Sequence, residues 1–508
     1  MRERAKAISV LTMNTLAFTV CFAVWVMYGV LITFLVDNRV FAFDKAQMGW
    51  LIGIPVLTGS LTRLPVGLLT DKYGGKPVYG SLLLLSAVFM YLQAGANSYM
   101  GFVLGGLGFG LSGASFAVGI AYTSVWFSKE KQGTALGIFG AGNAGSAITS
   151  VFAPLLLNYF TLQGANLDQW RNLPRVYALC LLITGILFFL VTENRVAPAA
   201  AHKSFGQLLA PLKIVRVWRF GLYYFLVFGG FVALAQWLIP YYVNVYGMSV
   251  AMAGLTASLF SFPSGVIRAI GGWMSDKLGA RAVMQWVLGL CLISFALLIV
   301  PRMDIWSPGS GVMASLGGVV KEVGEDSIIV TTSLGDRKHS YIARKGDAAV
   351  AQSDSEDMLV FPKSRFWQEP AVSVGDKVVK KQLLARGITH IYFQANVWIF
   401  TFLIFVVGIV MGIGKAAVYR HIPDYFPNDV GVVGGMVGVI GGLGGFACPI
   451  IFGYLLQYTG LWTTCWMFFL GLTALCLIWM HLVVRRIMQA EAPDVVRHIE
   501  DQSFAAID

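Results

Sequence analysis

Three cationic side chains stand inside long apolar stretches of this 508-residue sequence, namely Arg63, Arg268 and Lys415. Arg63 precedes Asp71 by eight residues, and eight residues span about 12 Å along a helix. An arginine near the middle of a bilayer costs on the order of 2.5 to 3.5 kcal/mol. Because no Asp or Glu lies well inside an apolar stretch, the counter-charge for the two arginines is expected to come from a bound anion.

The guanidinium group restricts which anion fits. Its planar fork donates two parallel hydrogen bonds to a planar oxyanion, whereas a lysine ammonium acts as a point charge. The alternative is that Arg63 and Arg268 only bind helix carbonyls or pin the helices together. Two uncompensated guanidinium groups repel each other in a medium of low dielectric constant, which weighs against this alternative for the pair.

Lys415 has two interpretations. It precedes Arg420 by five residues, and five residues span about 7.5 Å along a helix, so its amine could simply extend to the membrane surface. Otherwise Lys415 would serve in anion passage or proton coupling. His421, a few residues further on, is expected outside the hydrocarbon as a surface residue.

The elements that must position these cations are membrane-spanning helices. The chain is 57% hydrophobic and 12% charged, with a mean hydropathy of +0.70, whereas an average soluble domain has roughly 25% charged residues. This composition excludes a soluble fold. Apolar stretches of about 20 residues or more, long enough to cross a bilayer, predict an all-α membrane protein with twelve spans at 8–36, 46–70, 77–97, 99–126, 133–160, 173–193, 217–246, 250–275, 282–301, 394–420, 430–458 and 461–484.

The distribution of positive charge predicts the orientation. Arg2, Arg4 and Lys6 precede a first span that is too long for the core of a signal peptide. Placing them inside the cell leaves the short outer loops with only Arg39, Lys45, Arg171 and Arg175. Both termini are therefore expected in the cytoplasm, and the net charge of +11 needs no nucleic-acid partner. All six cysteines fall in predicted spans, so neither a disulfide nor a metal site is expected.

An internal repeat divides the chain into halves. Residues 63–76, RLPVGLLTDKYGGK, align without a gap with residues 268–281, RAIGGWMSDKLGAR, at an offset of 205. The shared pattern G-x-x-x-D-[RK]-x-G-x-[RK] resembles the loop signature of the major facilitator superfamily. This resemblance implies two six-helix halves with a substrate site between them at mid-depth. It also implies cytoplasmic gate loops at Asp71, Lys72, Asp276 and Lys277.

Residues 302–393 interrupt the helical pattern with polar sequence and short alternating stretches. They predict a β-rich insertion between the ninth and tenth spans, on the outer face. The stretch 374–382 resembles the strand-turn-strand of barrel-sandwich-hybrid domains but lacks the modified lysine of carrier domains, which favours a structural or docking module. The expected domains are the N-terminal half 1–196, a cytoplasmic loop 197–216, the C-terminal half 217–301 with 394–488, the periplasmic insertion 302–393 and a cytoplasmic tail 489–508.

Two spans in corresponding positions of the halves are rich in glycine. Small residues let membrane helices pack closely, but at this density the stretches also resemble the paired nitrate signatures of the nitrate/nitrite porter family. The signature glycines are Gly137, Gly140, Gly142, Gly145, Gly435, Gly438, Gly441, Gly442 and Gly444. This resemblance implies a substrate site with an arginine pair, two aromatic rings that sandwich the anion and two neutral donors, formed by Arg63, Arg268, Phe116, Phe228, Tyr224 and Asn143.

The resemblance implies a secondary transporter of nitrate and/or nitrite in the bacterial inner membrane, monomeric, without a cofactor and not an enzyme. It would work by alternating access, either as a nitrate/nitrite exchanger or by proton-coupled nitrate uptake through Lys415. Two other functions stay open. One is transport of another small organic anion, and the other is a transporter-like sensor that uses the outer insertion.

Overall fold

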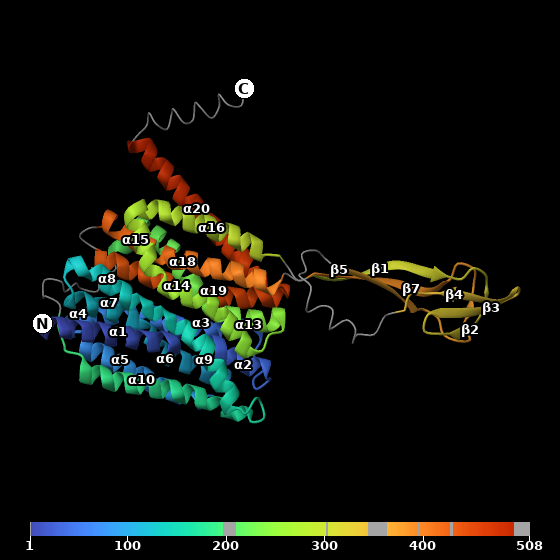
Figure 1. Ribbon diagram of the computed structural model, residues 1–508, viewed down its shortest axis with the longest axis horizontal. Coiled ribbons are helices and arrows are strands. Elements are labelled where there is room, and N and C mark those ends of the chain that lie inside the picture. The colour runs from blue at the N-terminus through green and yellow to red at the C-terminus, as the bar shows by residue number, and fades with distance from the viewer. Residues whose placement is uncertain are drawn as a thin grey trace, which may run out of the picture. The chain divides into compact units, whose positions relative to one another are not determined.

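The computed structural model describes residues 2–196, 210–300, 303–343, 363–393, 396–426 and 430–491. Most of the expected interdomain loop and the C-terminal tail lie outside these residues. The chain divides into two compact units, one formed by Met1–Ile299 with Thr401–Asp508 and the other by Val300–Phe400 (Figure 1).

The first unit is a helical bundle of two halves. Helices of the first half are α1 Arg2–Trp25, α2 Tyr28–Asp37, α3 Lys45–Leu61, α4 Arg63–Tyr73, α5 Gly75–Gln93, α6 Tyr99–Phe109, η1 Gly110–Ala114, α7 Ser115–Trp126, α8 Lys129–Gly140, η2 Ala141–Ala144, α9 Gly145–Phe160, η3 Leu167–Arg171 and α10 Asn172–Val191. Helices of the second half are η5 Ala210–Lys213, α12 Val215–Tyr224, η6 Phe225–Gly229, α13 Gly230–Tyr246, α14 Val250–Val266, α15 Arg268–Leu278, α16 Ala280–Leu298, α18 Val397–Tyr425, α19 Val430–Thr459 and α20 Thr464–Glu491.

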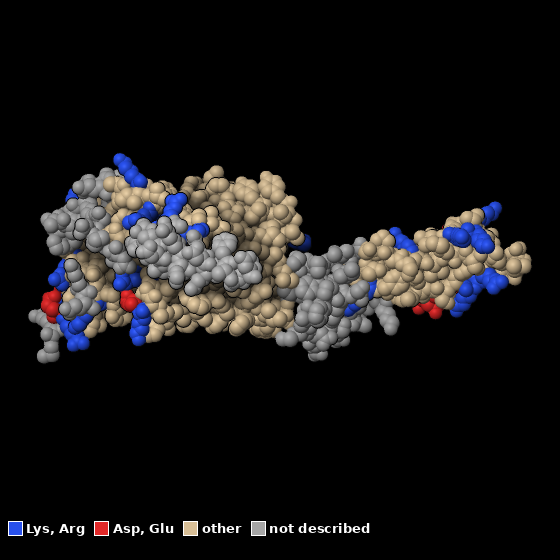
Figure 2. All heavy atoms as spheres, turned by 90° about the horizontal axis from the view of Figure 1, so that it is seen from above, with Lys and Arg blue, Asp and Glu red and all other residues tan. Residues whose placement is uncertain are grey.

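These helices confirm the predicted membrane fold. Among the described residues, 11 helical stretches are long and apolar enough to cross a bilayer, and α14 with α15, bent by 50°, makes up to 12. Lys and Arg of the helical unit gather near the end where the N-terminus lies and leave a broad band without visible charge (Figures 1 and 2). A band without charge is what the hydrocarbon layer of a bilayer requires.

The internal repeat is confirmed element by element. Helices α3, α4 and α5 correspond to α14, α15 and α16, and every pair of bounds differs by the same 205 residues as the two sequence motifs. In both copies of the motif the helix ends at a glycine with positive φ, Gly74 at 87° after α4 and Gly279 at 84° after α15. Residues other than glycine rarely adopt this conformation, so the chain turns within one residue. The expected gate loops are thus the last turns of α4 and α15.

Six of the described spans are interrupted partway along their length, the first of them at Val26 and Met27 between α1 and α2. α3 stops at Thr62 before α4 begins, and α14 stops at Ile267 before α15 begins. Three other spans contain the short 3₁₀ segments η1 and η2 and the π-helical segment η6. At Thr62 the side-chain hydroxyl donates to the carbonyl of Thr58, a contact that bends helices. Such interruptions are frequent at functional sites.

The two halves approach most closely where glycines remove the side chain. A Cβ at Gly49 of α3 would lie 2.4 Å from the carbonyl oxygen of Pro449 of α19, and one at Gly254 of α14 would lie 2.0 Å from that of Ser150 of α9. Both contacts join one half to the other. They lie toward the end of the bundle where α3 and α14 begin, so the halves are closed at that end.

The second unit confirms the expected β-rich insertion. Its strands are β1 Met303–Met313, β2 Gly318–Val323, β3 Ser327–Thr332, β4 Gly335–Ser340, β5 Lys363–Pro370, β6 Lys377–Val378 and β7 Leu383–Phe393. They form two antiparallel sheets, with strand orders β1-β7-β5 and β4-β3-β2-β6. A buried cluster that includes Val320, Ile328, Val330 and Leu384 forms the core. The expected strand-turn-strand at 374–382 contains only the two-residue strand β6.

Candidate functional site

Arg63 is the first residue of α4 and is only 4% exposed. Its Nη1 donates a 2.7 Å hydrogen bond to the carbonyl of Gly438 on α19, in the other half of the bundle. Its Nε and Nη2 are buried and have no hydrogen-bond partner among the described residues. These two nitrogens share one edge of the guanidinium group, the edge that donates two parallel bonds to a carboxylate or another planar oxyanion.

Arg268 occupies the equivalent position at the start of α15. Its Nη1 is also buried without a partner among the described residues. The side chain lies against Gly140 at the end of α8, where an added Cβ would be 3.5 Å from Cδ of Arg268. Each arginine therefore crosses to a glycine-rich segment of the opposite half, Arg63 to Gly438 and Arg268 to Gly140.

Phe116 lies between the two arginines. Its ring centroid is 5.3 Å from Cζ of Arg63 and 5.5 Å from Cζ of Arg268. The ring of Phe228 lies 5.2 Å from Cζ of Arg63, and the Phe116 and Phe228 rings are 6.2 Å apart with planes inclined by 24°. The faces of aromatic rings attract cations, so these two rings stabilise the guanidinium groups without neutralising their charge.

Tyr224 extends the aromatic wall. It stacks on Phe228 at 4.9 Å with planes inclined by 5°, and its buried hydroxyl has no hydrogen-bond partner within the described chain. Both residues flank or belong to the π-helical segment η6, in which the wider turn shifts the register of the side chains. A hydroxyl in this position can donate to a bound anion.

Asn143 lies in η2 and is fully buried. Its Nδ2 donates a 2.7 Å hydrogen bond to the carbonyl of Gly140, and its Oδ1 has no partner among the described residues. An amide nitrogen carries two hydrogens, so one of them is already engaged within the helix. Asn143 and Arg268 thus both contact Gly140, which places the two side chains close to each other.

Sequence reasoning missed Tyr419 on α18. Its ring meets Tyr224 edge-on at 5.0 Å, its centroid is 5.5 Å from Cζ of Arg268, and its hydroxyl donates to the carbonyl of Gly434 at 3.1 Å. The signal was present in the sequence, because Tyr419 follows Lys415 by four residues and so shares its helix face.

Lys415 is fully buried rather than extended to the surface. Its Nζ donates to the carbonyl of Ser264 at 3.2 Å and lies 3.2 Å from the centroid of the Phe231 ring. Arg268 is close enough to repel it. No Asp or Glu is buried in the parts of the chain that the structure describes, so a carbonyl and an aromatic face hold this ammonium group.

The residues of the expected gate loops lie away from these side chains, at the ends of α4 and α15. Asp276 pairs with Arg420 of α18 at 2.7 Å, and Lys277 lies 4.7 Å from the Trp273 ring. Lys72 lies 5.1 Å from the ring of Tyr73. The prediction that His421 is a surface residue is wrong. It is 5% exposed and stacks on Phe220 at 5.4 Å, because α18 continues to Tyr425 and keeps its ring inside the bundle.

Comparison with known proteins agrees with this arrangement. Residues 14–322 and 383–502 match the family model of the Major Facilitator Superfamily. The chain is 36% identical over 503 residues to a probable nitrate/nitrite antiporter of Thermus thermophilus, a match that covers 98% of this chain and 96% of the relative. It is 25% identical over 453 residues to a nitrite extrusion protein of Bacillus subtilis, with 89% and 88% covered.

Solved structures share the fold. A bacterial homologue of the human lysosomal transporter Spinster, in an inward-facing and occupied conformation, superimposes with a TM-score of 0.61 at 13% identity, over 94% of this chain and 96% of that one. The nucleoside transporter NupG gives a TM-score of 0.57 at 13% identity, over 94% and 98% of the chains. With its full-length similarity to the nitrate/nitrite antiporter, the chain belongs to the nitrate/nitrite porter family of the major facilitator superfamily.

Proposed function

We propose that the protein transports nitrate and nitrite across the bacterial inner membrane, and that the anion binds between Arg63 and Arg268. The observation that carries this proposal is the uncompensated arginine pair. One guanidinium comes from each half, both lie against the ring of Phe116, and both keep buried nitrogen atoms without partners among the described residues. A site that holds cations in this way attracts an anion and has no competing carboxylate.

The shape of the site favours a small flat anion over an organic acid. The Nε and Nη2 edge of Arg63 matches two oxygens of nitrate or nitrite. The rings of Phe116 and Phe228, 6.2 Å apart and nearly parallel, leave room for a planar group after a small movement but not for a bulky carboxylate. Tyr224 and Asn143 add neutral donors that release the anion more readily than further cations would.

Exchange of nitrate for nitrite is the coupling that this charge distribution favours. Cζ of Arg63 and Cζ of Arg268 lie 5.3 Å and 5.5 Å from the centroid of the Phe116 ring, so they are at most about 11 Å apart. Two unit charges at that separation repel each other by about 1.5 kcal/mol at an effective dielectric constant of ~20. When the halves close around an empty site this repulsion opposes closure, whereas a bound anion relieves it. A carrier that closes well only when loaded exchanges one anion for another. The Thermus thermophilus relative is named a probable nitrate/nitrite antiporter, which agrees with this mode.

Proton-coupled nitrate entry is the second candidate, and Lys415 supports it. Lys415 is fully buried near Arg268 and no buried Asp or Glu lies among the described residues, and burying an unpaired ammonium group is costly. An arriving anion would offset part of that penalty, so Lys415 could take up a proton together with nitrate and release both inside. Anion entry against an inside-negative potential costs about 2.3 kcal/mol per 100 mV, which a co-transported proton would compensate.

The proposed orientation places both termini in the cytoplasm, as the positive charges predict. In this orientation the closed end of the bundle, with Gly49 and Gly254, faces outward, and the last turns of α4 and α15 face inward. The insertion then joins two spans on the outer side.

The test is uptake of labelled nitrate into proteoliposomes. Vesicles preloaded with nitrite are compared with vesicles that contain no transported anion and carry an inward proton gradient. We expect uptake in the first and little in the second. Strong uptake in the second arm alone would establish symport in place of exchange. Uptake of an organic carboxylate with no uptake of nitrate or nitrite in either arm would contradict the proposed substrate.

A further inference from the structure

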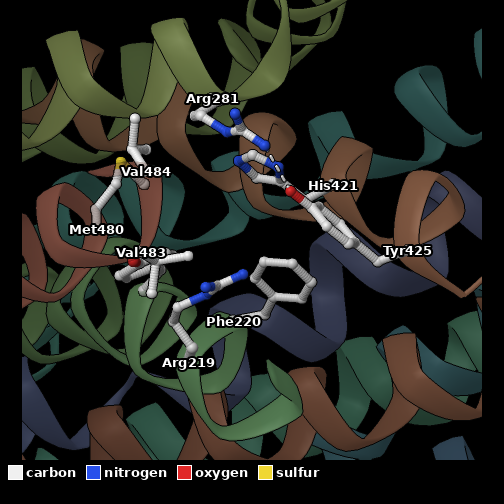
Figure 3. Close-up of a pocket in the computed structure, with 9 residues that line it drawn as sticks. Arg219, Phe220, Arg281, His421, Tyr425, Met480, Val483 and Val484 are labelled. Atoms are coloured by element: carbon white, nitrogen blue, oxygen red, sulfur yellow. Dashed lines mark hydrogen bonds between the residues drawn. The ribbon is translucent and has the colours of Figure 1, made fainter. Parts of the chain in front are cut away.

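A second basic hollow lies outside the transport site, at the end of the bundle where α12 and α16 begin and α18 and α20 end (Figure 3). It is a small hollow with a cavity volume of about 20 Å³, enough for roughly one water molecule or one oxygen-bearing group of a ligand. Arg219 and Tyr223 of α12, Arg281 of α16, and His421 and Tyr425 of α18 form its polar wall, and side chains of α20 close the other side.

The cations in and beside this hollow have no acidic partner among the described residues. Arg281 donates from Nη2 to the hydroxyl of Tyr425 at 2.7 Å, and Arg216 lies over the same ring at 4.9 Å. Arg219, only 8% exposed, feels the positive charges of both. None of the three forms an ion pair with a carboxylate in the described chain. Three like charges around one tyrosine repel each other unless an anion joins them.

One wall of the hollow also offers an unused donor. Tyr223 is 1% exposed, and its hydroxyl has no hydrogen-bond partner among the described residues although the residue lines the hollow. Leaving a buried hydroxyl without a partner is costly. Two guanidinium groups and a hydroxyl that converge on one space match a tetrahedral oxyanion, which accepts bonds from several directions.

The opposite wall is apolar and lies next to the lipid. Met480, Val483 and Val484 of α20 line it. Large apolar side chains on α16 and α20 are also exposed on the outer surface of the bundle, which faces the bilayer. They are Trp286 and Ile293 of α16, 70% and 60% exposed, and Ile478 and Leu482 of α20, 58% and 52% exposed. A basic pocket at the end of a span, with apolar residues leading away from it, is the arrangement that binds the headgroup of an anionic lipid.

We propose that this hollow is a second anion site that binds a phosphate group, coordinated by Arg219 and Arg281 with Tyr223 as an additional donor. It is separate from the transport site, because none of the residues that line it belongs to the arginine pair or its aromatic wall. The phosphate comes either from an anionic phospholipid or from the cytoplasm, and the two sources share the same recognition chemistry.

Binding to the purified full-length protein tests the proposal. Phosphatidylglycerol, zwitterionic phosphatidylcholine and inorganic phosphate are titrated in neutral detergent, with native mass spectrometry to count bound lipid and thermal unfolding to follow soluble anions. The variants are Arg219→Gln combined with Arg281→Gln, and Tyr223→Phe as a milder change. Arg486→Ala, an exposed cation of α20 outside the hollow, is the matched control.

We expect the wild type and Arg486→Ala to prefer phosphatidylglycerol to phosphatidylcholine, and the double variant to bind it at least about tenfold more weakly. Tyr223→Phe should lose a smaller part of the affinity, and this result remains informative if the double variant does not fold. Binding of inorganic phosphate, lost in the same variants, with no preference for phosphatidylglycerol would assign the soluble source. Equal binding by all variants, or displacement by nitrate as readily as by phosphate, would overturn the proposal.

Discussion

Replacing Arg63 by lysine tests the proposed anion site most directly, because the charge stays and the hydrogen-bonding edge is lost. In the wild type, Nη1 of Arg63 donates to the carbonyl of Gly438, while its Nε and Nη2 remain available to bind the anion. A lysine amine offers one bond in place of those two. A hydrogen bond that involves a charged group contributes about 1.5 to 3 kcal/mol, so nitrate should bind about 10- to 150-fold more weakly.

The loss should depend on the shape of the anion. Nitrate uses both donors of the guanidinium edge, whereas a spherical chloride ion gains little from two parallel bonds. Arg63→Lys should therefore reduce the ratio of nitrate affinity to chloride affinity as well as the affinity for nitrate. Arg268→Lys should act in the same direction, because Nη1 of Arg268 is also without a partner among the described residues.

The assay is calorimetric titration of nitrate, nitrite and chloride into detergent-purified protein, followed by labelled-nitrate uptake in proteoliposomes. Arg175→Lys is the matched control, since Arg175 is exposed and donates only to Asn172 in the described structure. If folded Arg63→Lys and Arg268→Lys both bind nitrate within about twofold of wild type, with an unchanged nitrate-to-chloride ratio, the arginine pair does not clamp the anion.

The remaining predictions concern the glycines, the insertion and the coupling group. Gly442→Ala would place a Cβ 2.3 Å from Oγ of Ser60 and crowd the guanidinium group of Arg63, so nitrate uptake should fall. Gly137→Ala is the control, because its Cβ would have nothing within 4 Å and transport should be normal. Equal uptake by the two variants would contradict this packing. Deleting residues 308–388, whose ends pair across β1 and β7, should leave transport intact, and a folded variant without nitrate binding would place the insertion in the site. Lys415→Met should keep nitrate/nitrite exchange and lose any proton-driven uptake, and strong gradient-driven uptake by this variant would exclude Lys415 as the coupling group.

Much of the fold could be predicted because apolar stretches and repeated residue types can be recognised directly in the amino-acid sequence. Twelve apolar stretches and a repeat with one constant offset identify two halves, and an arginine at the same place in each half predicts where the anion site lies. The interruptions before Arg63 and Arg268 leave no comparable mark. A helix that stops for one residue keeps the same apolar composition, so periodicity cannot place the break.

Other features depend on contacts between residues that are far apart in the chain. Tyr419 joins the site because α18 packs beside η6 and α19, and the burial of His421 follows from the extension of α18 to Tyr425. The identity of either residue gives no information about the helix it will face. The resemblance to the loop signature placed the gate residues in loops, whereas they lie in the last turns of α4 and α15, because a positive φ at Gly74 and Gly279 completes each turn within one residue.

The hydrogen bonds of the site explain how buried cations remain available to an anion. Arg63, Lys415, Asn143 and Tyr419 each donate to a main-chain carbonyl, on Gly438, Ser264, Gly140 and Gly434 respectively. A carbonyl dipole orients a cation but leaves its net charge in place, whereas a carboxylate would neutralise it and would have to be displaced by each arriving anion. Three of the four carbonyls belong to glycines, which let polar side chains reach the backbone. Helix carbonyls therefore hold these groups in position without neutralising Arg63 and Lys415, as the proposed anion site requires.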